Sequence, residues 1–313
     1  MATTPAAAKD RNVLSPGSVK TVTMVNPYIF LPLYLYPINS SWEGVIQSAV
    51  QYPDVNFQIV VAPNLVNVIP DQNYIENLQA LNNLTNVRTL GYVPTNWATR
   101  DMATVEQEID CYAAWANYTE ANIRVSGIFF DEAPSAANSD NLSYMGNVTS
   151  YARTALGPGT DHMTFNPGVF VDPAWYKIAD EIIIFENTWA AFNWSKLNEL
   201  SWDLMNQSVF LVYNFTGSTK DQKDLVRNLT DSNVGGSFIT TQDGYTSLST
   251  LWPQFVESMN DVTSSDFTGR DDDGDDCDDD DDDDDEDDDG DDDDDNGDDG
   301  DDDDGDDDED QED

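Results

Sequence analysis

The sequence has few of the residues on which disulfide-bonded and metal-centred folds depend. Its 313 residues include two cysteines and one histidine. Cys277 lies in an acidic C-terminal stretch, and Cys111 lies in a helical pattern where we expect a small, buried apolar side chain. This scarcity excludes a disulfide framework and a zinc site. We expect no cofactor.

Basic residues and long apolar segments are scarce as well. Lysine and arginine number 13 against 62 acidic residues, a net charge of −49. Such a chain repels nucleic-acid phosphates, and no apolar segment reaches membrane-spanning length. We therefore expect neither nucleic acid nor membrane as a partner. The first 24 residues also lack the apolar core of a secretory signal peptide.

Most of the negative charge lies in a C-terminal tail. From Asp271 to Asp313 there are 35 acids and no base. A block of like charges repels itself and buries no apolar surface, so we predict that residues 266–313 are disordered. The tail is a solubilising extension, an electrostatic contact for a cationic polymer, or a weak Ca²⁺ binder without an EF-hand loop. A flexible extension over residues 1–27 leaves 28–265 as the folded domain.

Eight apolar runs recur along this domain and are typical of strands buried on both faces of a parallel sheet. The runs are Ile29–Pro37, Phe57–Pro63, Val87–Thr95, Val125–Glu132, Met163–Pro167, Glu181–Asn187, Ser208–Asn214 and Gly235–Thr241. The segments between them have helical periodicity, with capping boxes predicted at Ser40–Glu43 and at Thr104 with Gln107.

Strands that alternate with helices eight times predict an α/β fold, the (β/α)8 TIM barrel, for which about 240 residues is a usual length. A doubly wound open sheet is the alternative. No G-x-G-x-x-G follows the first strand, so the main reason to prefer a dinucleotide-binding sheet is missing.

In a (β/α)8 barrel, functional residues gather at the C-terminal ends of the strands. These ends carry Asp131, Glu132 and Glu186 among amides and aromatic residues, whereas His162 precedes its strand. A Cys/His or Ser/His/Asp centre is therefore excluded. Paired carboxylates suit glycoside hydrolysis, which needs one protonated and one ionised carboxyl, and repulsion between adjacent acids raises one pKa. A hard-cation site built from the same three acids is the alternative.

Six segments, in order, resemble spherulation-specific family 4, the spherulin 4 family, which includes glycoside hydrolase family 135. The resemblance runs from about Leu31 to about Asn260. The segments are LPLYLYP (31–37), VVAPN (60–64), TLGYVPT (89–95), GIFFDEAP (127–134), FNPG (165–168) and IIFEN (183–187). The resemblance implies a (β/α)8 barrel that cleaves α-1,4-linked N-acetylgalactosamine inside galactosaminogalactan, an amino-sugar exopolysaccharide.

By this resemblance the family's catalytic acids fall on Asp131, Glu132 and Glu186. Our hypothesis is that one of the first two acts at the anomeric carbon, as nucleophile or stabiliser of charge, and that Glu186 is the general acid and then the base. The same residues with exchanged roles are the alternative. The distance between the carboxyl groups decides between a retaining and an inverting mechanism, and we favour the retaining one. We expect the substrate to be bound by Tyr36, Asn64, Asn166 and Asn214. Trp97, Trp175 and Trp189 are sugar platforms or core residues.

Two other interpretations keep the same cleft. One is a non-catalytic polysaccharide-binding protein of the cell wall or matrix, and the other is a hydrolase of a different amino-sugar polymer. Nine N-x-S/T sequons favour an extracellular or cell-wall glycoprotein. They begin at Asn39, Asn83, Asn117, Asn141, Asn147, Asn193, Asn206, Asn214 and Asn228.

Overall fold

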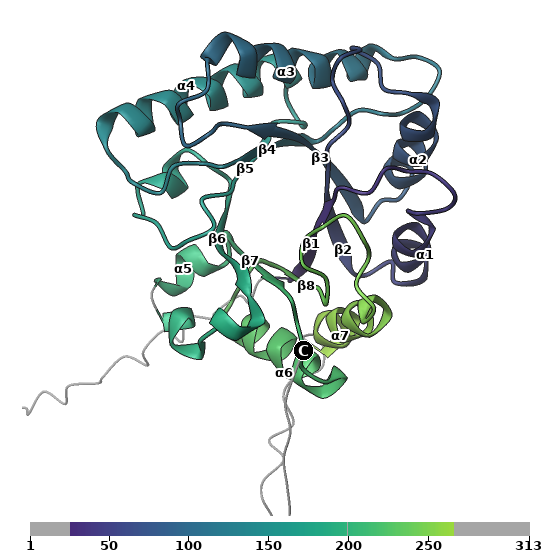
Figure 1. The fold of residues 1–313 in the computed structure, drawn as a ribbon, viewed down its shortest axis with the longest axis vertical. Coiled ribbons are helices and arrows are strands. Elements are labelled where there is room, and N and C mark those ends of the chain that lie inside the picture. Colours follow the sequence, from purple (N-terminus) through teal and green to yellow (C-terminus); the bar gives the residue numbers. More distant parts are fainter. Residues whose placement is uncertain (1–25, 199, 266–313) are drawn as a thin grey trace, which may run out of the picture. The chain divides into compact units, whose positions relative to one another are not determined.

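Eight parallel strands form a closed barrel in the order of the sequence (Figure 1). The computed structural model describes residues 26–198 and 200–265. The strands are β1 (Tyr28–Leu33), β2 (Asn56–Val61), β3 (Val87–Pro94), β4 (Gly127–Asp131), β5 (His162–Phe165), β6 (Glu181–Thr188), β7 (Ser208–Tyr213) and β8 (Gly236–Ile239). The predicted (β/α)8 barrel is confirmed. The predictions for the acidic tail, with Cys277, lie outside the described residues.

The helices lie outside the ring of strands (Figure 1). They are α1 (Glu43–Gln51), α2 (Gln72–Asn82), α3 (Met102–Ala114), α4 (Ser139–Leu156), α5 (Trp202–Met205), α6 (Thr219–Asp231) and α7 (Trp252–Ser265). One expectation is wrong, because the chain between β5 and β6 contains only a 3-10 turn, Trp175–Lys177. Pro167 and Pro173 fall in this short connection, and proline interrupts helical hydrogen bonding.

Both predicted capping boxes are also wrong. Trp42 is the N-cap of α1 and makes no side-chain cap, while the Ser41 hydroxyl donates to the carbonyl of Tyr36 at 2.7 Å. Helix α3 begins earlier than expected, and Asp101 caps it by accepting from the backbone N–H of Thr104 at 3.1 Å.

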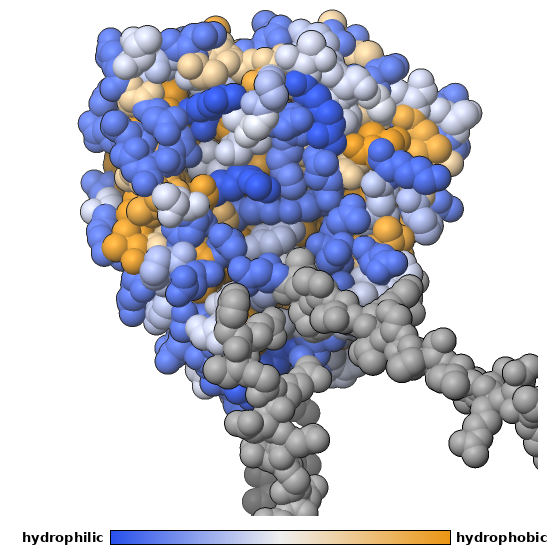
Figure 2. Space-filling view, turned by 180° about the vertical axis from the view of Figure 1, so that it is seen from behind, coloured by the Kyte–Doolittle hydropathy of each residue, from blue (hydrophilic) through white to orange (hydrophobic). Residues whose placement is uncertain are grey.

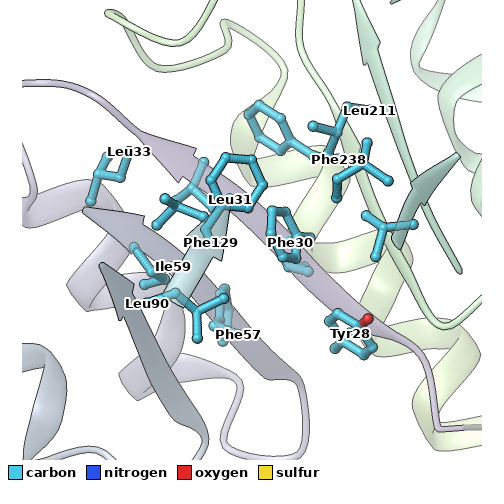
Figure 3. Packing of buried hydrophobic residues seen from close by; sticks show 14 of the residues in the cluster. Tyr28, Phe30, Leu31, Leu33, Phe57, Ile59, Leu90, Phe129, Leu211 and Phe238 are labelled. Atoms are coloured by element: carbon cyan, nitrogen blue, oxygen red, sulfur yellow. The ribbon is translucent and has the colours of Figure 1, made fainter. Parts of the chain in front are cut away.

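The barrel interior is filled by aromatic and aliphatic side chains (Figure 3). Phe30 of β1 contacts Phe129 of β4, with ring centres 5.7 Å apart, and Phe129 contacts Tyr92 of β3 at 6.1 Å. Tyr34 then lies edge-on to Tyr92 at 5.5 Å. Aromatic pairs at these distances add to the free energy of burial. The chain of rings supports the site at the C-terminal end of the barrel.

A β-bulge in β6 controls where its two glutamates point. Ile183 pairs with Val209 and Phe185 with Phe210, so Ile184 is an extra residue with no partner on β7. Side chains alternate along a regular strand, and one extra residue reverses that alternation. Glu181 and Glu186 are an odd number of residues apart, and the bulge lets both reach the barrel interior.

Glu181 belongs to a polar cluster at the N-terminal end of the barrel. It accepts a hydrogen bond from Gln58 of β2, which crosses the interior because β2 and β6 are not neighbours. The Nε2 atom of His162 lies 3.0 Å from its Oε2. Burial raises the pKa of Glu181, but His162, Gln58 and Tyr28 outweigh that effect and hold the pKa below its usual value. At this end of a barrel such a cluster indicates a role in stability.

The surface facing the viewer in Figure 2 is largely polar, with apolar side chains in separate patches. Among the described residues, no helix combines the length and the hydrophobicity needed to cross a bilayer. Cys111 is half-buried in α3 rather than fully buried as expected, and its thiol is free.

Candidate active site

Asp131 and Glu186 are joined by one side chain at the C-terminal end of the barrel. The Nδ2 of Asn166 donates to Asp131 Oδ1 at 2.8 Å and to Glu186 Oε2 at 2.6 Å. Because both bonds meet at one nitrogen, these two oxygens are at most about 5.4 Å apart. The structure thus brings together three residues that span 55 positions of the sequence.

Two tyrosines hold the outer oxygens of the same carboxylates. The hydroxyl of Tyr92 donates to Asp131 Oδ2 at 2.8 Å, and that of Tyr245 donates to Glu186 Oε1 at 2.8 Å. The ring of Tyr34 lies between these tyrosines, 5.5 Å from Tyr92 and 5.8 Å from Tyr245. Each acid therefore has two fixed donors, and its rotamer is set before a ligand arrives.

Burial raises the pKa of Glu186, and the nearby charge of Asp131 raises it further. Hydrogen bonds from Asn166 and Tyr245 favour the ionised carboxylate and oppose this shift only in part. A carboxyl with a raised pKa remains protonated closer to neutral pH, as a general acid must. The carboxyl with the raised pKa is thus Glu186, with burial as the main cause.

The loop FNPG places Glu186 against Asn166. The Glu186 N–H donates to the carbonyl of Gly168 at 3.0 Å. Gly168 has φ of +67°, a conformation that suits glycine, and a Cβ there would lie 3.6 Å from the Glu186 Cβ. Glycine at this position lets the loop turn closely over the acid.

Glu132 follows Asp131 in a left-handed conformation, with φ of +50°. Its carbonyl accepts from the Thr95 hydroxyl at 2.9 Å and from the Trp97 N–H at 2.7 Å. Among the residues that the structure describes, none forms a hydrogen bond with its carboxylate, which is half-buried. The backbone of Glu132 is fixed, and its side chain is available to a ligand.

The other three residues predicted to bind substrate follow strands at the same end of the barrel, Tyr36 after β1, Asn64 after β2 and Asn214 after β7. Each makes a hydrogen bond within its own surroundings and, in the described part of the chain, none with the two bridged acids. Tyr36 accepts from Asn73 at 2.8 Å, and Asn64 accepts from the N–H of Val66 at 3.0 Å. Asn214 donates to Asp243 at 3.0 Å. Of the four predicted residues, Asn166 is the one that contacts the carboxylates, and the roles of all four remain predictions.

The three tryptophans differ in their surroundings. Trp175 is buried and donates to the carbonyl of Ser135 at 3.2 Å, and Trp189 packs on Phe215 with ring centres 4.9 Å apart. Trp97 is 59% exposed.

Sequence reasoning missed Tyr92 and Tyr245. Tyr92 has a detectable signal, because it lies two residues before the end of β3 and alternation places it on the same face as Pro94. Tyr245 has none, since it lies in the loop after β8, outside any periodic pattern.

The cation site considered for the three acids is not formed by the described part of the chain, where no group of three or more His, Cys, Asp or Glu side chains is arranged to hold a metal ion. A cavity of about 520 Å³ lies at the opposite end of the barrel, bordered by Gln58, Arg88 and Glu181.

Comparison with known proteins identifies the family of this chain and relatives that share its fold. The sequence matches spherulation-specific family 4 over residues 28–259. Spherulin-4 of Physarum polycephalum is 30% identical over 185 residues, which cover 58% of this chain and 51% of that protein. The chain thus matches about half the length of that curated relative.

Among solved structures, Sph3 of Aspergillus clavatus, crystallised in complex with GalNAc, is 30% identical, with a TM-score of 0.71. The match covers 75% of this chain and 97% of Sph3. A chitinase from Bacteroides thetaiotaomicron, 10% identical with a TM-score of 0.52 over 75% of this chain and 96% of its own, shares the fold. The matched region contains β1 to β8 and the acids Asp131, Glu132 and Glu186. The chain belongs to spherulation-specific family 4.

Proposed function

We propose that this protein is an endo-acting glycoside hydrolase that cleaves α-1,4-linked N-acetylgalactosamine in a galactosaminogalactan-type polysaccharide. The observation that carries the proposal is the pair Asp131 and Glu186, whose two oxygens bonded to Asn166 are at most about 5.4 Å apart. In retaining glycosidases the two carboxyl groups are about 5–5.5 Å apart, whereas inverting enzymes keep about 6.5–9.5 Å for a water molecule. The spacing favours retention.

The difference between the two acids supports distinct roles. Glu186, whose pKa is raised, donates a proton to the glycosidic oxygen as the C1–O bond breaks. Asp131 attacks C1 from the opposite face and forms a glycosyl ester. Glu186, now ionised, takes a proton from water, whose oxygen attacks C1 and releases Asp131.

The chemistry of the proposed substrate is consistent with an enzyme nucleophile. In an α-linked N-acetylgalactosamine unit, the 2-acetamido group lies on the same side of the ring as the leaving group. It cannot attack C1 from behind, so a reaction with retention of configuration needs a nucleophile from the protein. Asp131 has the required acceptor oxygens, with Tyr92 and Asn166 stabilising their charge.

Asn166 supports an amino-sugar ligand on separate grounds. Its Oδ1 is buried and, among the described residues, has no hydrogen-bond partner. A buried unpaired acceptor is costly unless a ligand satisfies it. The Asn166 Oδ1 and the Glu132 carboxylate are both acceptors, so they suit a ligand rich in O–H and N–H donors. GalNAc, with which Sph3 was crystallised, is a ligand of this kind.

The decisive experiment compares product release from purified galactosaminogalactan by the wild type, Glu186→Gln and Asp131→Asn. We expect oligosaccharides from the wild type and a loss of at least about 10²-fold in both variants, with binding of the polymer retained. If all three proteins bind the polymer and none cuts it, the protein is a polysaccharide-binding protein. Cleavage of other amino-sugar polymers alone would replace the proposed substrate.

An extracellular or cell-wall location is part of the proposal. Of the nine sequon asparagines, seven are exposed, and Asn141 and Asn214 are half-buried. Expression in a secreting eukaryotic host, followed by glycosidase treatment, should lower the apparent mass. An unchanged mass would remove this support for secretion.

A further inference from the structure

We propose that Trp97 is a stacking subsite for a sugar ring beside the bond that is cut. This inference rests on the proposed function and adds to it a residue that binds the polymer. Trp97 follows β3, and 59% of its surface is exposed. Among the described residues, its indole makes no ring contact and no hydrogen bond.

Two other exposed aromatic residues are engaged within the protein, whereas Trp202 of α5, 41% exposed, also has no ring contact among the described residues but lies on the short helix that leads into the N-terminal end of β7. Tyr36 packs edge-on against Tyr74 with ring centres 5.7 Å apart, and Trp194 packs against Phe192 at 5.0 Å. Exposing a large aromatic ring without such a partner forgoes the free energy of its burial. Trp97 therefore presents a ring face to solvent at the end of the barrel that carries the acids.

The backbone around Trp97 is held in an unfavourable conformation. Asn96, Trp97 and Ala98 have φ values of +48°, +52° and +64°, and no glycine lies among them. Three consecutive L-residues in the left-handed region are uncommon, because each costs free energy relative to a right-handed conformation. Strain of this kind concentrates at functional sites, where the surrounding structure maintains it.

The hydrogen bonds that maintain this turn join it to the backbone of Asp131 and Glu132. The Trp97 N–H donates to the Glu132 carbonyl at 2.7 Å, and the Thr95 N–H donates to the Asp131 carbonyl at 2.9 Å. On the other side, Arg100 donates to the carbonyl of Pro94 at 2.9 Å and pairs with Glu108. The position of the indole is thereby coupled to the backbone of Asp131 and Glu132.

This arrangement divides the recognition of a sugar chain between two kinds of surface. The acids and Asn166 meet polar groups of the unit being cleaved, while the indole face meets the C–H face of a neighbouring unit. A polymer gains from this second contact, whereas a monosaccharide does not.

The test compares Trp97→Gly with Ala98→Gly. Both substitutions place glycine in the left-handed turn and relieve strain there, but only the first removes the indole. We expect Trp97→Gly to raise the KM for galactosaminogalactan about tenfold with kcat retained. Ala98→Gly should have the wild-type KM, and neither variant should have a Tm below that of the wild type. Trp97→Phe, which keeps an aromatic face, should recover part of the affinity.

The outcomes separate this inference from the proposed function. A wild-type KM in Trp97→Gly, with the wild type active, would overturn the stacking role and leave the hydrolase in place. A lower kcat at unchanged KM, or a marked fall in Tm, would also overturn it, since Trp97 would then act through the Glu132 backbone or through packing. If the wild type neither binds nor cuts the polymer, the proposed function fails, and the inference fails with it.

Discussion

Removing the Tyr245 hydroxyl should shift the pH dependence of the reaction upward. Tyr245 donates to Glu186 Oε1 at 2.8 Å and so favours the ionised carboxylate. A hydrogen bond to a charged group contributes about 1.5–3 kcal/mol, and one pKa unit corresponds to about 1.36 kcal/mol. In Tyr245→Phe the pKa of Glu186 should therefore rise further, because the ionised carboxylate loses that stabilisation.

The assay is the pH profile of kcat/KM for the wild type and Tyr245→Phe. The general acid has to be protonated, so the alkaline limb of the profile follows the pKa of Glu186 and should move to higher pH. Tyr34→Phe is the matched control, because Tyr34 lies between Tyr92 and Tyr245 and, among the described residues, makes no hydrogen bond to either acid. An alkaline limb that stays in place, or moves to lower pH, would refute the role of Glu186 as the acid.

The same substitution has a consequence for stability, and its sign follows from the raised pKa. A group whose pKa is raised by folding contributes stability below its unfolded pKa and loses it as pH rises through the folded value. Tyr245→Phe raises the folded pKa further. Its Tm should therefore lie below the wild-type Tm at neutral pH and approach it in acid.

Three further changes test other parts of the structure. Asn166→Ala should lower kcat at least about tenfold and also lower Tm, because two half-buried carboxylates lose their shared donor; unchanged kinetics would show that the bridge is dispensable. His162→Gln should lower the free energy of unfolding by about 1–3 kcal/mol at neutral pH. Because folding lowers the pKa of Glu181, its stabilising effect is present above its unfolded pKa and is lost as pH falls through its folded pKa. The free energies of unfolding of the wild type and His162→Gln, measured by urea titration, should therefore converge in acid. Removing residues 271–313 should leave activity on short neutral oligosaccharides unchanged, and loss of that activity would show that the tail is part of the fold.

The strands could be predicted because the physics that forms them is local. A strand covered on both faces has to be apolar throughout, and each of the eight apolar runs overlaps one strand. Asp131 and Glu186 could be placed at the C-terminal end of the barrel for the same reason. The helix boundaries were harder to predict from the sequence. Trp42 and Asp101 are the N-caps of α1 and α3 because the preceding loops end there, and the sequence pattern does not show where a loop ends.

The network around the acids could not be predicted, because its members come from unrelated loops. Asn166 was expected to bind sugar, and the structure also places its amide nitrogen between two carboxylates, with one oxygen left over for a ligand. Tyr245 reaches Glu186 from the loop after β8, and only the closed barrel brings them together. The spacing of residues in the sequence does not predict such contacts unless the topology of the barrel is known.

The two glutamates of β6 show how closely function depends on one backbone irregularity. Glu181 contacts His162 and has a lowered pKa, whereas Glu186 is half-buried beside Asp131 and has a raised one. In a regular strand of this length they would face opposite sides, and only one would reach the interior. The unpaired residue Ile184 brings both inside, one to the stabilising end of the barrel and one to the candidate active site. A β-bulge that re-aims a side chain next to a site is thus the feature that allows one strand to supply both a stabilising contact with His162 and the carboxyl that we propose as the general acid.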